Sequence, residues 1–111
     1  MAKSIIQPNI RTKQDRECVL CKLEAARNNH YGELAHDGLH KHHIMGGPDR
    51  KKSEHWGVWC YLCLEHHETG ENAVHNTGDK NGRFLKELGQ RAFEKRYGHD
   101  KWMEVFGKNY L

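Results

Sequence analysis

The sequence lacks any long apolar run, and only 36% of its 111 residues are hydrophobic. No stretch approaches the ~18 apolar residues of a transmembrane helix, so we expect no membrane segment. Residues 1–8 lack the apolar stretch of a secretory signal. The mean hydropathy of −0.98 indicates a poor hydrocarbon core. A domain this small often depends on disulfides, metal or oligomerisation for its stability, and the sequence leaves the oligomeric state open.

Cysteine and histidine, by contrast, are abundant, with four Cys and ten His in the chain. Without an export signal we expect a cytoplasmic, reducing compartment, where paired cysteines typically bind metal rather than form disulfides. The formal charge of +3 and the pI near 8.7 permit a nucleic-acid partner without requiring one. The composition therefore favours a small cytoplasmic protein stabilised by a metal.

The residue pattern predicts one small α+β domain over residues 17–111, preceded by a polar arm over residues 1–16 that shows no periodicity. Glycine and proline at residues 46–48 require a turn after the first strand. Asp100 is expected to cap the last helix. The expected elements are strands at 39–45 and 55–62, paired antiparallel, a solvated loop at 49–54 between them, and helices at 64–69, 81–97 and 100–106.

Two cysteine pairs have the spacing of zinc ligands. Cys18 and Cys21 form a knuckle whose short loop lets two thiolates reach one tetrahedral zinc. The second half of the site has two registers in the sequence. One uses Cys60 and Cys63, which makes a four-cysteine site, and the other uses Cys63 and His66, which makes a site of three cysteines and one histidine.

Between these pairs lies a His-His-Ile run at residues 42–44, then Gly-Gly at 46–47, and later Leu-Cys-x-x-His-His at 62–67. In this order the motifs resemble those of the HNH, or His-Me finger, endonucleases, and the resemblance covers roughly residues 18–111. It implies a ββα-metal core with a structural zinc over residues 17–78, followed by C-terminal helices over 79–111. Small phage and prophage proteins of this type look similar, which implies a bacterial host cell.

The resemblance also implies roles for individual residues. His43 stands at the position of the general base, and His42 and His67 stand at ligand positions for a catalytic divalent metal (Mg²⁺, Mn²⁺, Ni²⁺ or Zn²⁺). His66 replaces the second cysteine of the family motif, which favours Cys18, Cys21, Cys63 and His66 over Cys60 for the structural zinc. Cys60 is then expected to be a spare thiol that faces outward from the second strand. His75 is a further candidate ligand of the catalytic metal.

The expected function is hydrolysis of DNA phosphodiester bonds. Histidine suits the base role, because a neutral imidazole accepts a proton near pH 7. Arg50, Lys51 and Lys52 lie between the two catalytic motifs and are expected to contact DNA phosphates. Val58 stands near the middle asparagine of the family pattern. The alternative is therefore a catalytically inactive, zinc-stabilised module of a phage that binds nucleic acid or interacts with another protein.

Overall fold

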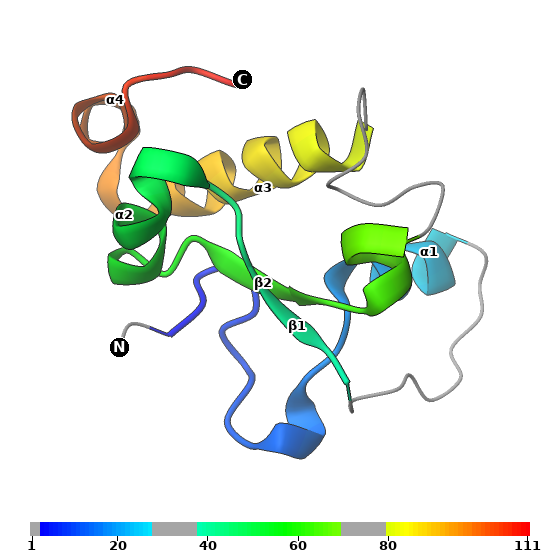
Figure 1. Ribbon diagram of the computed structural model, residues 1–111. Coiled ribbons are helices and arrows are strands. Elements are labelled where there is room, and N and C mark those ends of the chain that lie inside the picture. The colour runs from blue at the N-terminus through cyan, green and yellow to red at the C-terminus, as the bar shows by residue number, and fades with distance from the viewer. Residues whose placement is uncertain (1–2, 28–37, 70–79) are drawn as a thin grey trace.

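The computed structural model describes residues 3–27, 38–69 and 80–111. Two short strands cross the middle of the molecule, and the long helix α3 passes over them (Figure 1). Helix α1 lies toward one end of the strand pair, and α2 and α4 lie toward the other. The helices and strands are α1 (Val19–Arg27), β1 (His40–His43), α2 (Arg50–His55), β2 (Trp59–Leu62), α3 (Lys80–Tyr97) and α4 (His99–Phe106).

The predicted antiparallel strand pair is confirmed, although both strands are shorter than expected. His40 pairs with Leu62, His42 with Cys60 and His43 with Trp59. Since residues directly opposite each other project to the same face of a sheet, one face carries His42 and Cys60. The other face carries Lys41 and Tyr61. The two neighbouring histidines of the His-His-Ile run therefore start from opposite faces of the hairpin.

The expected loop at residues 49–54 is wrong, because residues 50–55 form helix α2. A 3₁₀ turn with Pro48 near its start leads into this helix, and Arg, Lys and Glu are good helix formers. Ser53 is fully buried inside it. Its hydroxyl donates to the carbonyl of Val58 and accepts the backbone N–H of Met45 at 3.2 Å. The helix is thus tied to the end of β1 and to the residue before β2.

Helices α3 and α4 build most of the aromatic core. Phe93 and Trp102 are fully buried, with ring centroids 5.4 Å apart. A Cβ on Gly89 of α3 would lie 3.0 Å from Val58, so this glycine allows the helix to approach the strand pair closely. The predicted helices are confirmed here. Asp100 does not cap α4, however, because the helix starts at His99 and Asp100 lies in its first turn.

The N-terminal segment, residues 3–16, lies along the outer side of β2. Ser4 is buried and its hydroxyl donates to the carbonyl of Trp59 at 2.5 Å. The backbone N–H of Ile5 donates to Gly57 at 2.9 Å, and the amide oxygen of Gln7 accepts the backbone N–H of Tyr61 at 2.9 Å. The segment therefore supplies partners to β2 on the side that β1 does not occupy. The domain boundary at residue 16 stays a prediction.

Candidate metal centre and histidine cleft

Four side chains converge between α1 and the start of the π-helical turn η3 (Glu65–Thr69). Cys18 precedes α1 and Cys21 lies in its first turn, while Cys63 and His66 stand in the same relation to η3. Each pair is spaced by three residues, and this spacing places side chains side by side on one helical turn. Their ligand atoms all lie within 4.8 Å of one another. This group could hold a structural metal such as zinc.

The distances within the group fit a tetrahedral zinc. With Zn–S bonds of about 2.3 Å and a Zn–N bond of about 2.0 Å, tetrahedral ligands lie about 3.8 Å apart for two sulfurs and about 3.5 Å apart for sulfur and nitrogen. The sulfurs of Cys21 and Cys63 are 3.7 Å apart. Nδ1 of His66 lies 3.4, 3.3 and 3.2 Å from the sulfurs of Cys18, Cys21 and Cys63. Because all four atoms face a common centre, the donor set suits zinc.

A carboxylate orients the histidine of this group. Nε2 of His66 lies 3.0 Å from Oε1 of Glu24, which projects from the next turn of α1. A hydrogen bond at Nε2 leaves the lone pair of Nδ1 for the metal, and such partners fix the tautomer and the ring orientation of metal-binding histidines. The sequence motifs did not point to Glu24. Its position three residues after Cys21 is the signal that places it on the ligand side of α1.

The cysteines differ in acidity. Burial raises the pKa of the Cys18 and Cys21 thiols above the usual value. Burial acts in the same direction on Cys63, but hydrogen bonds from the backbone and side chain of His66 outweigh it and lower the pKa of that thiol. Zinc binds thiolates, so metal binding must release the protons of Cys18 and Cys21. Acidic conditions therefore oppose metal binding.

Cys60 lies outside the group of four. It is fully buried in the core, where burial raises the pKa of its thiol. The expectation that a spare Cys60 would face outward from the second strand is wrong. It projects to the same face as Leu62, which also packs into the core. The four ligands brought together are thus the set that the family motif favoured over the four-cysteine register.

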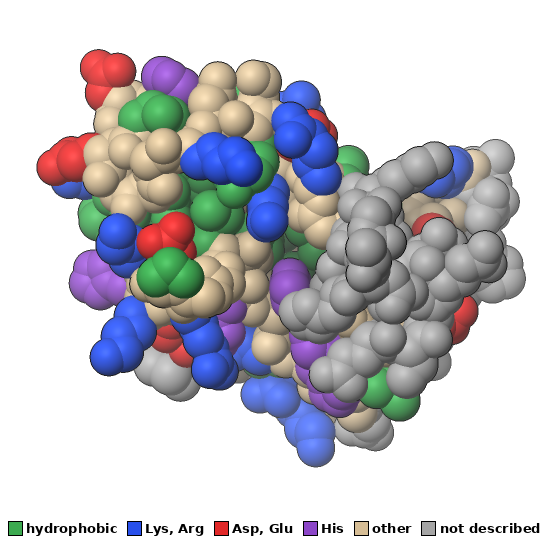
Figure 2. Space-filling model, turned by 45° about the horizontal axis from the view of Figure 1, so that its top comes forward, with side chains coloured by type: hydrophobic (Ala, Val, Ile, Leu, Met, Phe, Trp, Pro, Cys, Tyr) green, Lys and Arg blue, Asp and Glu red, His purple; other side chains and the backbone are tan. Residues whose placement is uncertain are grey.

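Three histidines gather next to the metal group. Nδ1 of His40 lies 3.0 Å from Nδ1 of His67, and the rings of His42 and His67 meet edge to face with centroids 5.4 Å apart. Figure 2 shows histidine side chains in a row on one face of the molecule, with lysine and arginine side chains nearby. His42 and His67 line an open cleft of about 260 Å³, and the whole lining is Lys41, His42, His43, Gly46, Arg50 and His67.

His43 reaches this cleft because β1 ends at His43 and the chain turns away there. Nε of Arg50 donates to Nδ1 of His43 at 3.5 Å, and Nε2 of His43 lies 3.6 Å from Glu54. Arginine can only donate, so Nδ1 accepts and Nε2 carries the proton that faces Glu54. His42 and His43 thus line one cleft although they start from opposite faces of the strand.

Lys41 binds the same carboxylate from the other side. Its ammonium lies 2.7 and 2.8 Å from the two oxygens of Glu54. This hydrogen bond outweighs partial burial and holds the pKa of the Glu54 carboxyl below its usual range. Glu54 therefore remains charged at neutral pH and keeps Lys41 and His43 together. The sequence motifs gave no indication of its role.

The three basic residues that were expected to bind DNA take different positions. Arg50 lines the cleft. Lys51 is exposed on α2 and does not line it. Lys52 donates to the carbonyl of Val105 at 3.0 Å and so ties α2 to α4. Of the three, Arg50 alone stands where it would meet a phosphate bound in the cleft.

Val58, which stands near the middle asparagine of the family pattern, lies in the core. Val58 is fully buried, and its carbonyl accepts the backbone N–H of Ile44 at 3.2 Å as well as the Ser53 hydroxyl. Its side chain makes no polar contact, whereas Ser53 bonds the residues after β1 and before β2. His75 lies outside the described residues.

In the described parts of the chain, Cys18, Cys21, Cys63 and His66 form the one compact group of three or more metal-ligand side chains. His42 and His67 therefore offer two imidazoles without a third ligand in that part of the chain. None of the described helices combines the length and the apolarity that a membrane crossing needs. Comparisons of this chain with protein-family models, curated proteins and solved structures found no match.

Proposed function

We propose that this protein is a metal-dependent endonuclease of the HNH type, with a ββα-metal core, that hydrolyses DNA phosphodiester bonds. The observation that carries the proposal is the cleft, in which His42, His43 and His67 lie together with Lys41 and Arg50. The order of β1, β2 and the turn η3 along the chain supports the proposal, because such a core consists of two strands followed by a helix. A purely structural zinc protein has no need of these three histidines.

His42 and His67 are the residues that would hold a divalent cation in the cleft. Both side chains line the cleft, and Nδ1 of His67 also lies 3.0 Å from Nδ1 of His40. Two protein ligands leave coordination positions for water and a phosphate oxygen. A cation held there supplies charge neutralisation at the phosphate oxygens and at the leaving oxygen.

His43 is the proposed general base. In the structure its Nδ1 accepts a hydrogen bond from Arg50. When the guanidinium of Arg50 turns to a phosphate instead, it gains a charge-assisted hydrogen bond and frees the Nδ1 lone pair for the proton of the attacking water. Glu54 then holds the Nε2 side of the ring and stabilises the imidazolium. The family resemblance implies 5′-phosphate and 3′-hydroxyl products.

Ser53 supports the proposal, because its hydroxyl makes hydrogen bonds of the kind that the asparagine of the family pattern makes and that Val58 cannot make. Asparagine in that pattern orients the loop that carries the base through hydrogen bonds, and Val58 cannot make them. The Ser53 hydroxyl instead links Met45 and Val58 across the hairpin. The buried valine favours the second candidate, a zinc-stabilised module that binds nucleic acid or protein without cutting. The two candidates differ in whether DNA is hydrolysed.

Nicking of supercoiled plasmid with Mg²⁺, Mn²⁺, Ni²⁺ or Zn²⁺ tests the proposal. Wild type should nick DNA in the presence of one of these ions, and His43→Ala should nick about 10²–10⁴-fold more slowly, the usual contribution of a general base. His99→Ala is the matched control, because His99 is exposed on α4 and pairs with Glu94 away from the cleft. Absence of metal-dependent nicking, or equal rates for His43→Ala and wild type, would refute the proposal.

A further inference from the structure

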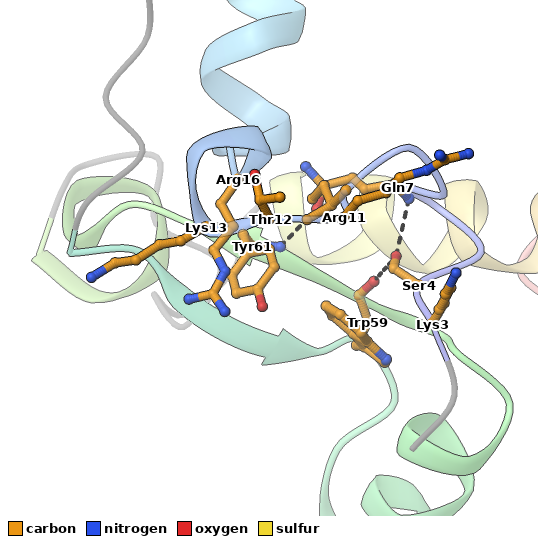
Figure 3. A pocket seen from close by; sticks show the side chains of 10 residues that line it. Lys3, Ser4, Gln7, Arg11, Thr12, Lys13, Arg16, Trp59 and Tyr61 are labelled. Atoms are coloured by element: carbon orange, nitrogen blue, oxygen red, sulfur yellow. Dashed lines mark hydrogen bonds between the residues drawn. The ribbon is translucent and has the colours of Figure 1, made fainter.

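A second hollow, about 230 Å³ in volume, lies between the N-terminal segment and the outer side of β2. Figure 3 shows basic side chains of the segment around the rings of Trp59 and Tyr61. Among the described residues no carboxylate lines this hollow. Its lining includes four cations and two aromatic rings, namely Lys3, Arg11, Lys13, Arg16, Trp59 and Tyr61. We call it the arm pocket.

Hydrogen bonds fix the N-terminal segment that forms one wall of the arm pocket. Ser4 and Gln7 bond the backbone of Trp59 and Tyr61, and the amide nitrogen of Gln7 donates to the carbonyl of Glu17 at 2.8 Å. The nearby carboxylate of Asp15 accepts the backbone N–H groups of Arg11 and Thr12, which closes the turn of the segment outside the pocket. The backbone that carries the cations is therefore fixed before any ligand arrives, which lowers the entropy cost of binding.

Arg16 is presented for anion binding. Its guanidinium carbon lies 5.0 Å from the centre of the Tyr61 ring. Stacking uses the flat face of a guanidinium and leaves its N–H edges, which match the oxygens of a phosphate in a bidentate manner. Figure 3 shows Arg16 beside Tyr61 on the pocket side of β2. Phosphate is thus the group that the pocket's charge and hydrogen-bond donors fit.

The arm pocket adjoins the histidine cleft through Lys41 and His43, which lie on the same face of the hairpin as Trp59 and Tyr61. Tyr61 is paired with Lys41, and Trp59 with His43. The ammonium of Lys41 lies 4.1 Å from the centre of the Trp59 ring and so joins the two hollows. Lys41 also lines the histidine cleft. A strand that leaves the cleft past Lys41 and Trp59 would therefore meet the cations of the N-terminal segment.

We propose that the arm pocket binds the phosphate backbone of the nucleic acid, at a second contact point outside the cleft. This inference rests on the proposed function, because it names the substrate strand as the ligand. Free phosphate or a mononucleotide shares the same chemistry, and the experiment below separates these sources. The pocket would hold the strand in register while His43 acts on one of its phosphodiester bonds.

The test measures binding of a labelled DNA duplex to the full zinc-loaded chain carrying His43→Ala, which slows cutting. Each phosphate contact contributes about 0.9 to the slope of log K against log salt concentration for duplex DNA. Adding Lys3→Gln and Arg11→Gln together should therefore lower that slope by about 1.8 and weaken binding at least tenfold near 100 mM salt. The conservative pair Lys3→Arg and Arg11→Lys should keep the slope.

The matched control pair is Lys95→Gln and Arg96→Gln, which removes one lysine and one arginine from the exposed side of α3. It should change the slope by much less. The arm pair is the variant with Lys3→Gln and Arg11→Gln. An equal decrease of the slope in the arm pair and the control pair, or an unchanged slope in the arm pair, would overturn the inference. So would binding of inorganic phosphate or a deoxynucleoside monophosphate as tight as that of the duplex.

The two proposals fail separately in these experiments. If the wild type nicks plasmid but the arm pair binds DNA with an unchanged slope, the arm pocket is not a phosphate site and the nuclease stands. If the wild type never nicks plasmid but the arm pair loses the expected slope, the arm pocket binds nucleic acid and the nuclease proposal falls.

Discussion

Glu24 illustrates how one residue outside the ligand set supports the metal group. Its carboxylate lies 3.0 Å from Nε2 of His66, and loss of such a partner typically lowers metal affinity 10–100-fold. We expect Glu24→Gln to weaken zinc binding by that factor, measured by competition with a coloured zinc chelator. Glu104→Gln is the control, because Glu104 is exposed on α4, and it should leave zinc affinity unchanged. Unaltered affinity in Glu24→Gln would show that this hydrogen bond does not orient the ligand.

The two cysteines of the second pair should behave differently when replaced. Cys63 belongs to the group of four, whereas Cys60 is buried in the core away from it. Cys63→Ala should abolish stoichiometric zinc, because three ligands remain. Cys60→Ala should keep one zinc per chain and lose about 1 kcal/mol of stability, a typical cost of a small core substitution. Metal analysis of both purified variants measures this, and the opposite pattern would favour the four-cysteine register.

At the scale of elements, the contact between the N-terminal segment and the strand pair depends on Gly57. Its φ of +75° lies in the left-handed region, and a Cβ there would stand 2.3 Å from the backbone oxygen of Lys3. Gly57→Ala should therefore cost about 1–3 kcal/mol of folding free energy and displace the segment that forms the arm pocket. Urea unfolding measures the loss of stability.

Gly46 provides the matched control for that substitution. Its φ is −92°, and nothing lies within 4 Å of an added Cβ. Gly46→Ala should change stability by no more than about 0.5 kcal/mol, as is usual for surface substitutions. A comparable loss in the two variants would mean that the close approach of Lys3 to Gly57 does not decide the effect.

For the whole molecule, the metal group adds a cross-link at one end of a core that also contains Val19 and Leu20 of α1. Its ligands connect α1 to the end of the strand pair, while the aromatic core around Phe93 and Trp102 lies under α3 and α4. Structural zinc contributes on the order of 10 kcal/mol in small metal domains. We expect one zinc per chain and a cooperative loss of structure when a strong chelator removes it, followed by circular dichroism. Folded protein that contains no zinc would contradict this.

The sequence by itself determined the features that depend on local spacing. Cys18 and Cys21 are close because three residues make nearly one helical turn, and the apolar period of residues 84–97 predicts α3 for the same reason. The antiparallel strand pair also followed from residue pattern and turn signals. Each of these depends on neighbours along the chain.

The tertiary structure decided which of the equally spaced alternatives is used. Cys60 and His66 lie at the same distance in sequence from Cys63, but β2 directs Cys60 into the core, and the turn η3 returns His66 to Cys18. Helix α2, the salt bridge of Glu54 and the position of the N-terminal segment likewise depend on contacts between residues far apart in the sequence. Local propensity does not contain these contacts, because they form only when packing brings the segments together.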